Sequence, residues 1–461
     1  MKGLEDLEKA IKRKQIFTKK NLIYLIIPLI IEQLLAVAVG MADSIMVSSV
    51  GEAAVSAVSL VDSINILLIN IFAALATGGA VVAGQYIGSN STDNAKKAGE
   101  QLIVFVTIIS LIIMAVMLVG KNFILNKVFG AIDQDVANYA NTYMSIVFFS
   151  IPFIAIYNSG AALFRTMGNS KVTMKTSIIM NAINVSGNAI LIYGFKMGVE
   201  GVAIPTLISR AVAAIIIILL LRDESLIINI RDYFKYKFDG NMVRNILRIG
   251  IPNGIENSMF QLGKILLLSV VSGFGTTSIT ANAVANSITS FQNLPAVSIG
   301  LALITVVSQS VGAGDYENVR YYTKILHKYA YIALICTNVI IILATPLILD
   351  AYNLSAETAA MARKIILFYG INACIVWPLS FTLPNTLRAA NDVRFTMAVS
   401  VSSMWITRIG LGIFFAKFMN LGMFGIWIAM FCDWYVRSFL FVIRYKGHKW
   451  GKVKKSLNSG A

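Results

Sequence analysis

Two carboxylate side chains lie in the first apolar stretch of the chain, Glu32 and Asp43. In an α-helix, eleven residues rotate by about 1100°, so the two would lie within about 20° of one face and about 16 Å apart along the axis. Ionisable groups in apolar segments are costly and mark ion or substrate pathways. A carboxyl group placed there can exchange a proton for a cation. We therefore predict that Asp43 exchanges an ion or proton, with Glu32 as a second candidate for the same role. The alternative is that a salt bridge holds them, that Asp43 caps a broken helix, or that Glu32 occupies the turn disturbed by Pro28.

Asparagine side chains supply the second class of polar groups in apolar segments. Asn181, Asn184 and Asn188 form a polar stripe on one predicted helix, 173–194. An amide oxygen can ligate a cation, although the group does not titrate. We predict that Asn184 and Asn188 share a coupling site with Asp43, which could hold Na⁺. Packing between helices by hydrogen bonds, worth about 0.6 kcal/mol each, is the alternative.

Further polar residues in apolar stretches predict a wet central cavity, because amides in hydrocarbon are costly. The candidate cavity residues are Asp62, Asn65, Asn70, Asn181, Asn282 and Asn286.

Two other predictions concern the pairing of charged residues in the second half of the chain. Asp433 and Arg437 are four residues apart, a spacing that predicts an ion pair within one helix. Lys264 is expected to pair with a carboxylate.

The composition indicates an all-α integral membrane protein. The 461 residues are 57% hydrophobic and 13% charged, with mean hydropathy +0.73, against about 25% charged in soluble domains. The run 265–314 contains no charged residue and is long enough for two spans of about 20 residues. The apolar pattern predicts twelve helices, at 22–48, 54–84, 101–120, 139–164, 173–194, 199–221, 247–273, 279–311, 326–349, 359–386, 395–417 and 421–443.

The net charge of +16 could suggest nucleic acid, but the distribution of the basic residues favours a membrane topology. Alternate loops carry most of the 39 Lys and Arg residues. The intervening loops hold only Lys121, Lys127, Lys196, Arg363, Lys364 and Lys417. Basic loops remain in the cytoplasm, which predicts that both termini are cytoplasmic and that nucleic acid is no partner.

The second half of the chain repeats the first. Pro28 and Glu32 return 224 residues later as Pro252 and Glu256, and Gln85 returns as Gln309. A parallel repeat with six helices in each copy predicts two lobes related by a pseudo-two-fold axis along the membrane normal. The predicted division is a cytoplasmic lead at 1–20, an N-lobe at 21–222, a cytoplasmic linker at 223–246, a C-lobe at 247–445 and a cytoplasmic tail at 446–461.

The two copies differ in their titratable groups. Asp43 corresponds to Leu267, and Asp62 corresponds to Asn286. The N-lobe is therefore the expected place for ion exchange. Glu256, four residues after a proline, is a further coupling candidate, but a salt bridge or a hinge at the proline suits it equally.

Several separated blocks resemble the multidrug and toxic compound extrusion (MATE) family. They are GMADSIMVSSVGEAAVSAVSL from Gly40, the later ATGGAVVAGQYIG, and LGMFGIWIAMFCDW near the C-terminus. The resemblance implies a V-shaped exporter of twelve helices that expels organic, often cationic compounds, driven by inward Na⁺ or H⁺. It places Asp43 on the family's helix 1 aspartate and Asn188 on a second acidic position. The helix 7 glutamate of other branches lies about one turn after Glu256.

These observations predict a secondary active multidrug exporter in the bacterial plasma membrane. We expect a multi-pass monomer that contacts membrane lipid, uses no cofactor and catalyses no reaction, with small organic cations as substrates. No GxxxxGK[ST] segment for direct use of ATP is present. A flippase for lipid-linked precursors is the closest alternative, and an ion channel and a receptor are more distant ones.

Overall fold

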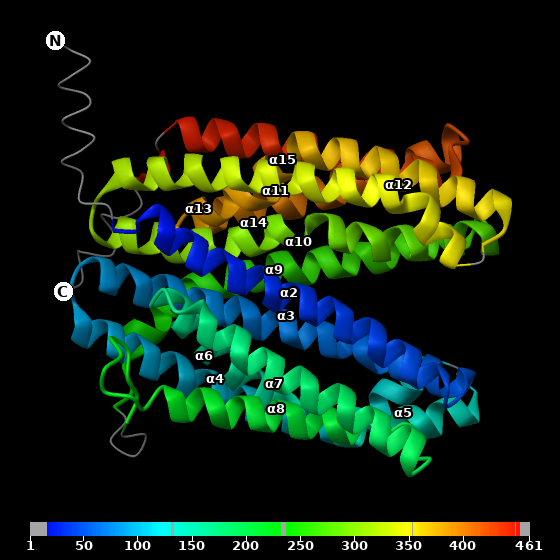
Figure 1. Cartoon of the computed structure of the whole chain (residues 1–461), viewed down its shortest axis with the longest axis horizontal. Coiled ribbons are helices and arrows are strands. Elements are labelled where there is room, and N and C mark those ends of the chain that lie inside the picture. Colours follow the sequence, from blue (N-terminus) through cyan, green and yellow to red (C-terminus); the bar gives the residue numbers. More distant parts are fainter. Residues whose placement is uncertain (1–15, 131–132, 232–236, 353, 448, 452–461) are drawn as a thin grey trace.

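The structure is a computed structural model that describes residues 16–130, 133–231, 237–352, 354–447 and 449–451. Its regular structure over these residues is helical throughout. Figure 1 shows two bundles of long helices, which lie close together at the end where the described chain begins at residue 16 and ends at residue 451, and spread apart at the other end. Most of the predicted lead, residues 232–236 of the linker and most of the tail lie outside the described residues.

The N-lobe contains the first six spans, and several of these are built from consecutive segments. Its elements are α2 (Lys19–Ser48), α3 (Glu52–Gly88), α4 (Thr92–Phe123), η1 (Ile124–Val128), α5 (Gln134–Val147), η2 (Phe148–Ser150), α6 (Ile151–Thr166), α7 (Ser170–Ala189), η3 (Ile190–Gly194) and α8 (Glu200–Leu220). The observed helices extend beyond the predicted apolar runs, because polar turns at both ends continue the helical hydrogen bonding.

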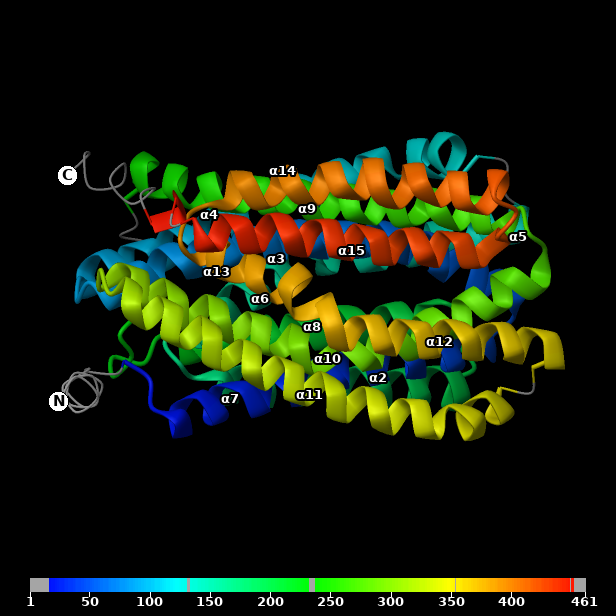
Figure 2. The same ribbon diagram turned by 90° about the horizontal axis from the view of Figure 1, so that it is seen from above.

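The C-lobe repeats this order. Its elements are α9 (Gly240–Ser272), α10 (Thr276–Gly312), α11 (Tyr316–Ala351), α12 (Ala356–Trp377), η5 (Pro378–Thr382), α13 (Leu383–Ala389), α14 (Val393–Ser403), η6 (Met404–Leu411), η7 (Phe414–Phe418) and α15 (Gly422–Lys446). Figure 2 shows α9, α14 and α15 on one side of this lobe and α10, α11 and α12 on the other. The first helix, α9, begins inside the stretch predicted as the linker.

Eleven of these helical units are long and apolar enough to cross a membrane. The twelfth, α9, has 33 residues but carries Arg244, Arg248, Glu256 and Lys264 along its length. These charges lower its hydropathy, although it occupies the place of α2 in the repeat. The predicted fold, two lobes of six helices each, is therefore confirmed.

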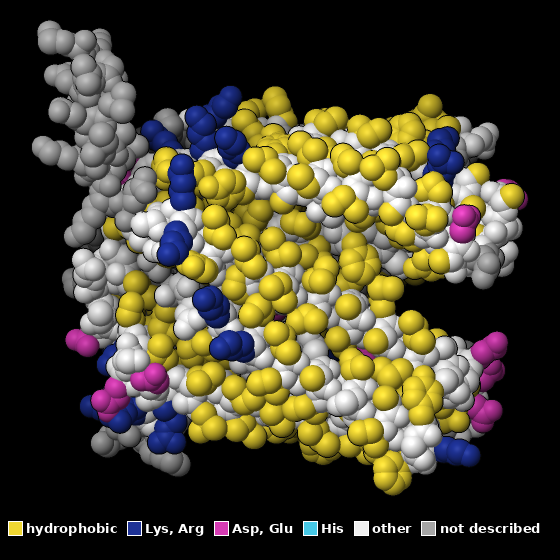
Figure 3. Space-filling view, in the orientation of Figure 1, with side chains coloured by type: hydrophobic (Ala, Val, Ile, Leu, Met, Phe, Trp, Pro, Cys, Tyr) yellow, Lys and Arg dark blue, Asp and Glu magenta, His cyan; other side chains and the backbone are white. Residues whose placement is uncertain are grey.

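The lobes meet mainly through α3, which packs against α9 and α10, and through α2, which crosses α10. Figure 3 shows a hollow between the lobes at the end opposite the termini. In this view Lys and Arg side chains gather toward the terminal end, and most of the middle surface is apolar. An apolar band between polar ends matches a bilayer, whose hydrocarbon core is about 30 Å thick.

Candidate functional site

A group of polar side chains from several helices gathers inside the N-lobe. It lies beside the second half of α2, which ends at Ser48. We call Asp43, Asp62, Tyr143, Asn188 and Arg210 the N-lobe acidic cluster. The Nδ2 atom of Asn188 donates a hydrogen bond to Asp43 Oδ1 at 2.7 Å. Tyr143 donates its hydroxyl proton to Asp62 Oδ1 at 3.2 Å. Arg210 donates to Ser150 at 2.8 Å instead of bonding an aspartate. Asp43 is half-buried and forms no ion pair with any described residue, so its carboxyl group is available to a proton or cation.

Two unpartnered oxygens lie on α7, the helix that bonds Asp43 through Asn188. The Oδ1 atoms of Asn184 and Asn188 are buried and accept no hydrogen bond from the described residues. Asn184 uses its Nδ2 atom to bond Thr206 at 3.1 Å, which leaves its oxygen free. Oxygen atoms of carboxylates and carbonyls are the preferred ligands of hard cations. The side-chain oxygens of Asp43, Asn184 and Asn188 are of the kind that Na⁺ prefers, and Asp43 is the one of the three that can also take up a proton.

The predicted cavity residues divide between the two lobes. Asn65 joins the N-lobe cluster by donating to Asp62 at 3.2 Å, whereas Asn70 lies farther along α3 and makes no hydrogen bond to it. Asn181 donates to Ser177 at 3.3 Å within α7. Asn282 accepts from Trp427 at 3.2 Å, and Asn286 is exposed and bonds the Asn282 carbonyl. These last two lie on α10, so the structure does not bring all six residues into one site.

Glu32 and Glu256 occupy repeat-related salt bridges. Glu32 contacts Arg165 at 3.2 Å and accepts a hydrogen bond from Thr173 at 2.7 Å. Glu256 contacts Arg388 at 2.6 Å. Both glutamates are buried, with 7% and 5% exposure. A carboxylate fixed by a guanidinium group already has its counterion. The salt-bridge alternative therefore describes both residues, and we restrict the coupling hypothesis to Asp43 and its neighbours.

The Glu32→Gln substitution tests this structural role. We expect it to lower stability by about 3–5 kcal/mol, because removal of one partner leaves the other charge buried and unpaired. The apparent melting temperature in lipid nanodiscs should fall, while the coupling ion stays the same. Glu52, which is exposed at the start of α3, provides the control Glu52→Gln with little change. If Glu32→Gln has normal stability but loses ion coupling, this prediction is wrong and Glu32 takes part in ion coupling.

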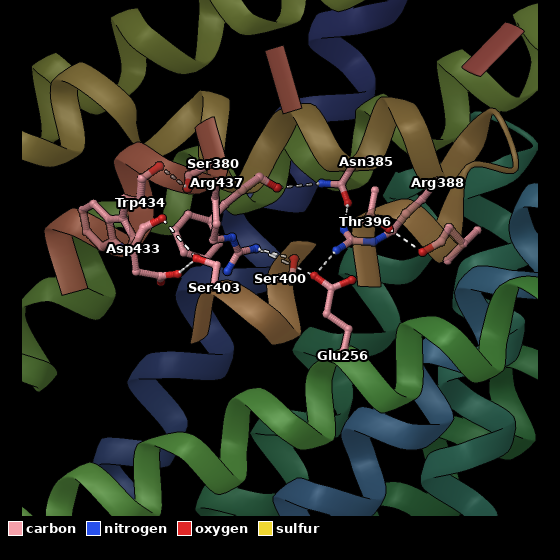
Figure 4. Close-up of polar contacts among 12 residues, drawn as sticks. Glu256, Ser380, Asn385, Arg388, Thr396, Ser400, Ser403, Asp433, Trp434 and Arg437 are labelled. Carbon is pink, nitrogen blue, oxygen red and sulfur yellow. Dashed lines mark hydrogen bonds and ion pairs between the residues drawn. The ribbon is translucent and has the colours of Figure 1, made fainter. Parts of the chain in front are cut away.

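The charges of the C-lobe pair differently from the sequence prediction. Asp433 binds Arg408 at 2.9 Å, not Arg437. Arg437 instead points toward Glu256 at 3.7 Å and donates to Ser400 at 3.0 Å, as Figure 4 shows. The predicted Asp433–Arg437 pair is therefore wrong, because neighbouring helices offer both residues closer partners. The predicted carboxylate partner of Lys264 is also absent among the described residues.

A pair of glutamines joins the lobes at the end near the termini. Gln85 of α3 donates to the Ala389 carbonyl at 2.9 Å, and Gln309 of α10 donates to the Thr166 carbonyl at 2.7 Å. Each bond crosses from one lobe to the other, and the repeat relates the two. Gly88 and Gly312 lie against the backbone of Gln309 and Gln85, where a Cβ atom would overlap the carbonyl oxygen. We call these four residues the glutamine clasp, and it holds the lobes together at this end.

An apolar pocket of about 480 Å³ lies between α2, α10 and α11. On α2 it is lined by Ile30, Leu34 and Met41, each two residues away from Glu32 or Asp43. A two-residue step rotates by about 200°, so the pocket lies on the opposite face of α2. It is therefore separate from the N-lobe acidic cluster.

Several site residues were not identified from the sequence. Tyr143, Ser150, Arg210 and Thr206 come from helices whose facing surfaces depend on packing between helices. Arg165 and Arg388 could have been found, because they recur at corresponding positions of the repeat, as the two glutamates do. An acidic and a basic residue that both recur in the repeat predict one equivalent ion pair in each lobe.

Comparison with known proteins identifies the family. The MatE family profile matches residues 28–190 and 252–414, one match in each lobe. A probable multidrug resistance protein, YoeA of Bacillus subtilis, is 24% identical and covers 87% of both chains. An uncharacterized transporter of the same organism, YisQ, is 27% identical over 92% of this chain and 93% of its own.

Solved structures agree in fold. An outward-facing multidrug resistance MATE transporter superposes with a TM-score of 0.85 at 20% identity and covers 96% of this chain and 97% of its own. A MATE transporter in the bent conformation gives a TM-score of 0.83 over 95% and 96% of the two chains. With the profile matching both lobes, the chain belongs to the MATE family of membrane transporters.

Proposed function

We propose that this transporter exports small organic, mainly cationic compounds from the bacterial cytoplasm in exchange for inward H⁺ or Na⁺. The observation that carries the proposal is the state of Asp43, a half-buried carboxyl group without an ion-pair partner among the described residues. It accepts a hydrogen bond from Asn188 at 2.7 Å, and the Oδ1 atoms of Asn188 and of Asn184, four residues before it on α7, have no partner among the described residues. Such a group can hold either a cation or a proton. The name of the relative YoeA, a probable multidrug resistance protein, supports the substrate class.

The shape of the molecule supports an alternating-access cycle. The lobes are separated at the end opposite the termini and closed by the glutamine clasp at the other end. We assign the clasped end to the cytoplasm, since basic side chains gather there. In the proposed cycle, an ion or proton reaches Asp43 from outside and displaces a bound organic cation. The loaded lobes then close outside and open inside, where the ion leaves and another substrate binds.

Vesicles with purified protein test this proposal. We expect a fluorescent organic cation to be transported when either a pH or a Na⁺ gradient is imposed alone, and the effective gradient identifies the coupling ion. ATP should have no effect. Equal dye movement with and without both gradients would contradict antiport.

The same vesicles separate the flippase alternative. A flippase would move a labelled lipid-linked pyrophosphate between leaflets and leave the dye in place. Two of the arginines that a pyrophosphate would need are already bonded to carboxylates, since Arg388 binds Glu256 and Arg408 binds Asp433. We therefore expect dye transport without lipid movement.

A further inference from the structure

One part of the C-lobe contains more cations than anions. Lys264, Arg388, Arg408 and Arg437 gather there with two carboxylates, Glu256 and Asp433. We call these six residues the C-lobe cationic cluster. Arg388 holds Glu256 at 2.6 Å, and Arg408 holds Asp433 at 2.9 Å. These pairs leave the charges of Lys264 and Arg437 without a carboxylate of their own, because Arg437 reaches the already bonded Glu256 only at 3.7 Å.

Three of these cations surround one aromatic ring. The centroid of the Phe260 ring lies 4.8 Å from Arg408 Cζ, 5.9 Å from Arg437 Cζ and 5.5 Å from Lys264 Nζ. An aromatic face stabilises a cation by about 0.5–2 kcal/mol. It supplies no negative charge, so the like charges still repel one another. A buried excess of one sign is costly unless an opposite charge joins it.

The cluster also holds hydrogen-bond donors that lack acceptors. Arg437 is 2% exposed, and its Nε and Nη1 atoms have no partner among the described residues. Its Nη2 atom is used by Ser400, as Figure 4 shows. A buried donor without an acceptor costs about 1–3 kcal/mol, and more when it is charged. Both the charge and the free donors would be satisfied by one anion.

The repeat supports a binding role for this place. The position of Gly40 in the N-lobe is occupied by Lys264 in the C-lobe, and that of Asp43 is occupied by Leu267. At this place the N-lobe has side-chain oxygens that suit a cation. The corresponding part of the C-lobe has basic side chains that suit an anion. Lys264 is exposed, so its ammonium group is within reach of a ligand that enters from outside the cluster.

We propose that the C-lobe cationic cluster binds a small monovalent anion beside Lys264, Arg408 and Arg437. The anion is either the carboxylate of an exported compound or a halide ion. In the first case the substrates include zwitterions, whose cationic end is handled by the N-lobe. This substrate assignment rests on the proposed antiport function, whereas anion binding itself does not.

Thermal stability in lipid nanodiscs tests anion binding without transport. Sodium gluconate is replaced stepwise by sodium chloride or sodium benzoate at constant Na⁺ concentration. We expect a saturable rise of the apparent melting temperature in the wild type. In Lys264→Gln the anion concentration for half the effect should increase at least about tenfold, and Lys264→Arg should restore most of the response because the charge returns.

Matched variants make this result specific. Lys364 lies over the ring of Phe424 at 4.1 Å, outside the cluster, so Lys364→Gln should keep the full anion response. Asp43→Asn should also keep it, which separates a failure of this proposal from a failure of the coupling hypothesis. An equal response in Lys264→Gln and wild type, or no saturable response in the wild type, would overturn the anion site.

Transport in vesicles then identifies the source of the anion. A cationic dye with a carboxylate and its methyl ester are compared in chloride and in gluconate. If the substrate supplies the anion, Lys264→Gln slows the carboxylate dye alone. If a halide is bound, the variant slows both dyes, and gluconate slows both in the wild type. Rates that do not depend on Lys264, dye or salt would also refute the proposal.

Discussion

Asp43→Asn is expected to give a folded protein that no longer couples dye export to an ion gradient. Asparagine can still accept the hydrogen bond that Asn188 donates at 2.7 Å, so the packing of α2 against α7 should persist. It can neither bind a transported proton nor attract a cation by charge. Coupling free energies of about 1–3 kcal/mol correspond to about 5- to 150-fold effects. We expect gradient-driven export in vesicles to fall by a factor at the upper end of this range.

The control for this variant removes a carboxylate at the outer surface. Asp350 is exposed near the end of α11, and Asp350→Asn should transport at the wild-type rate. Both proteins should show the same apparent melting temperature. If Asp43→Asn keeps gradient-driven export at normal expression, Asp43 is not the coupling group.

Gly88→Ala is expected to open the end of the molecule that is closed in this structure. A Cβ atom at this position would overlap the backbone carbonyl of Gln309 in the other lobe, and a backbone atom cannot rotate away as a side chain can. Overpacking of this kind costs about 1–3 kcal/mol. Because only the clasped state suffers this overlap, the cost should shift the population toward the opposite conformation by about 5- to 150-fold.

Distances between spin labels measure this shift. Labels at Asn90 and Ala313 report on the two lobes at the clasped end, in a background with the three cysteines replaced by serine. Gly88→Ala should increase the fraction of long distances. Gly40→Ala is the matched control, because a Cβ there meets nothing within 4 Å. An unchanged distance distribution in Gly88→Ala would show that the clasp does not set the conformation.

The sequence predicted the architecture well because both of its signals were strong. Apolar runs of membrane length located the helices, and Pro28, Glu32 and Gln85 recurred in the second half. The shared face of Glu32 and Asp43 also agrees with the structure, since both accept hydrogen bonds from α7, from Thr173 and Asn188. The helix α9 was harder, because its charges weaken the apolar pattern, and its repeat position was the more useful signal.

The ion pairs of the C-lobe could not be predicted from spacing along one helix. Arg408 lies in η6, a π-helical segment at Met404–Leu411. A π-helix changes the number of residues in each turn and so moves a side chain to a different face. Asp433 then finds Arg408 on a neighbouring element instead of Arg437 one turn along its own helix. Partners of this kind depend on tertiary packing.

The length of sealed protein between Asp43 and the glutamine clasp determines which step of the cycle responds to the membrane voltage. Asp43 lies near the end of α2 at Ser48, far from the clasp that joins Gln85 and Gln309 to the opposite lobes. If water fills the entrance between the lobes, it conducts, and the membrane voltage then drops mostly across the sealed protein between Asp43 and the clasp. Moving one elementary charge through 100 mV involves about 2.3 kcal/mol. Most of this electrical work should therefore be done during the change from the outward-open to the inward-open conformation. We expect the voltage to change the rate of that step more than the affinity for the ion.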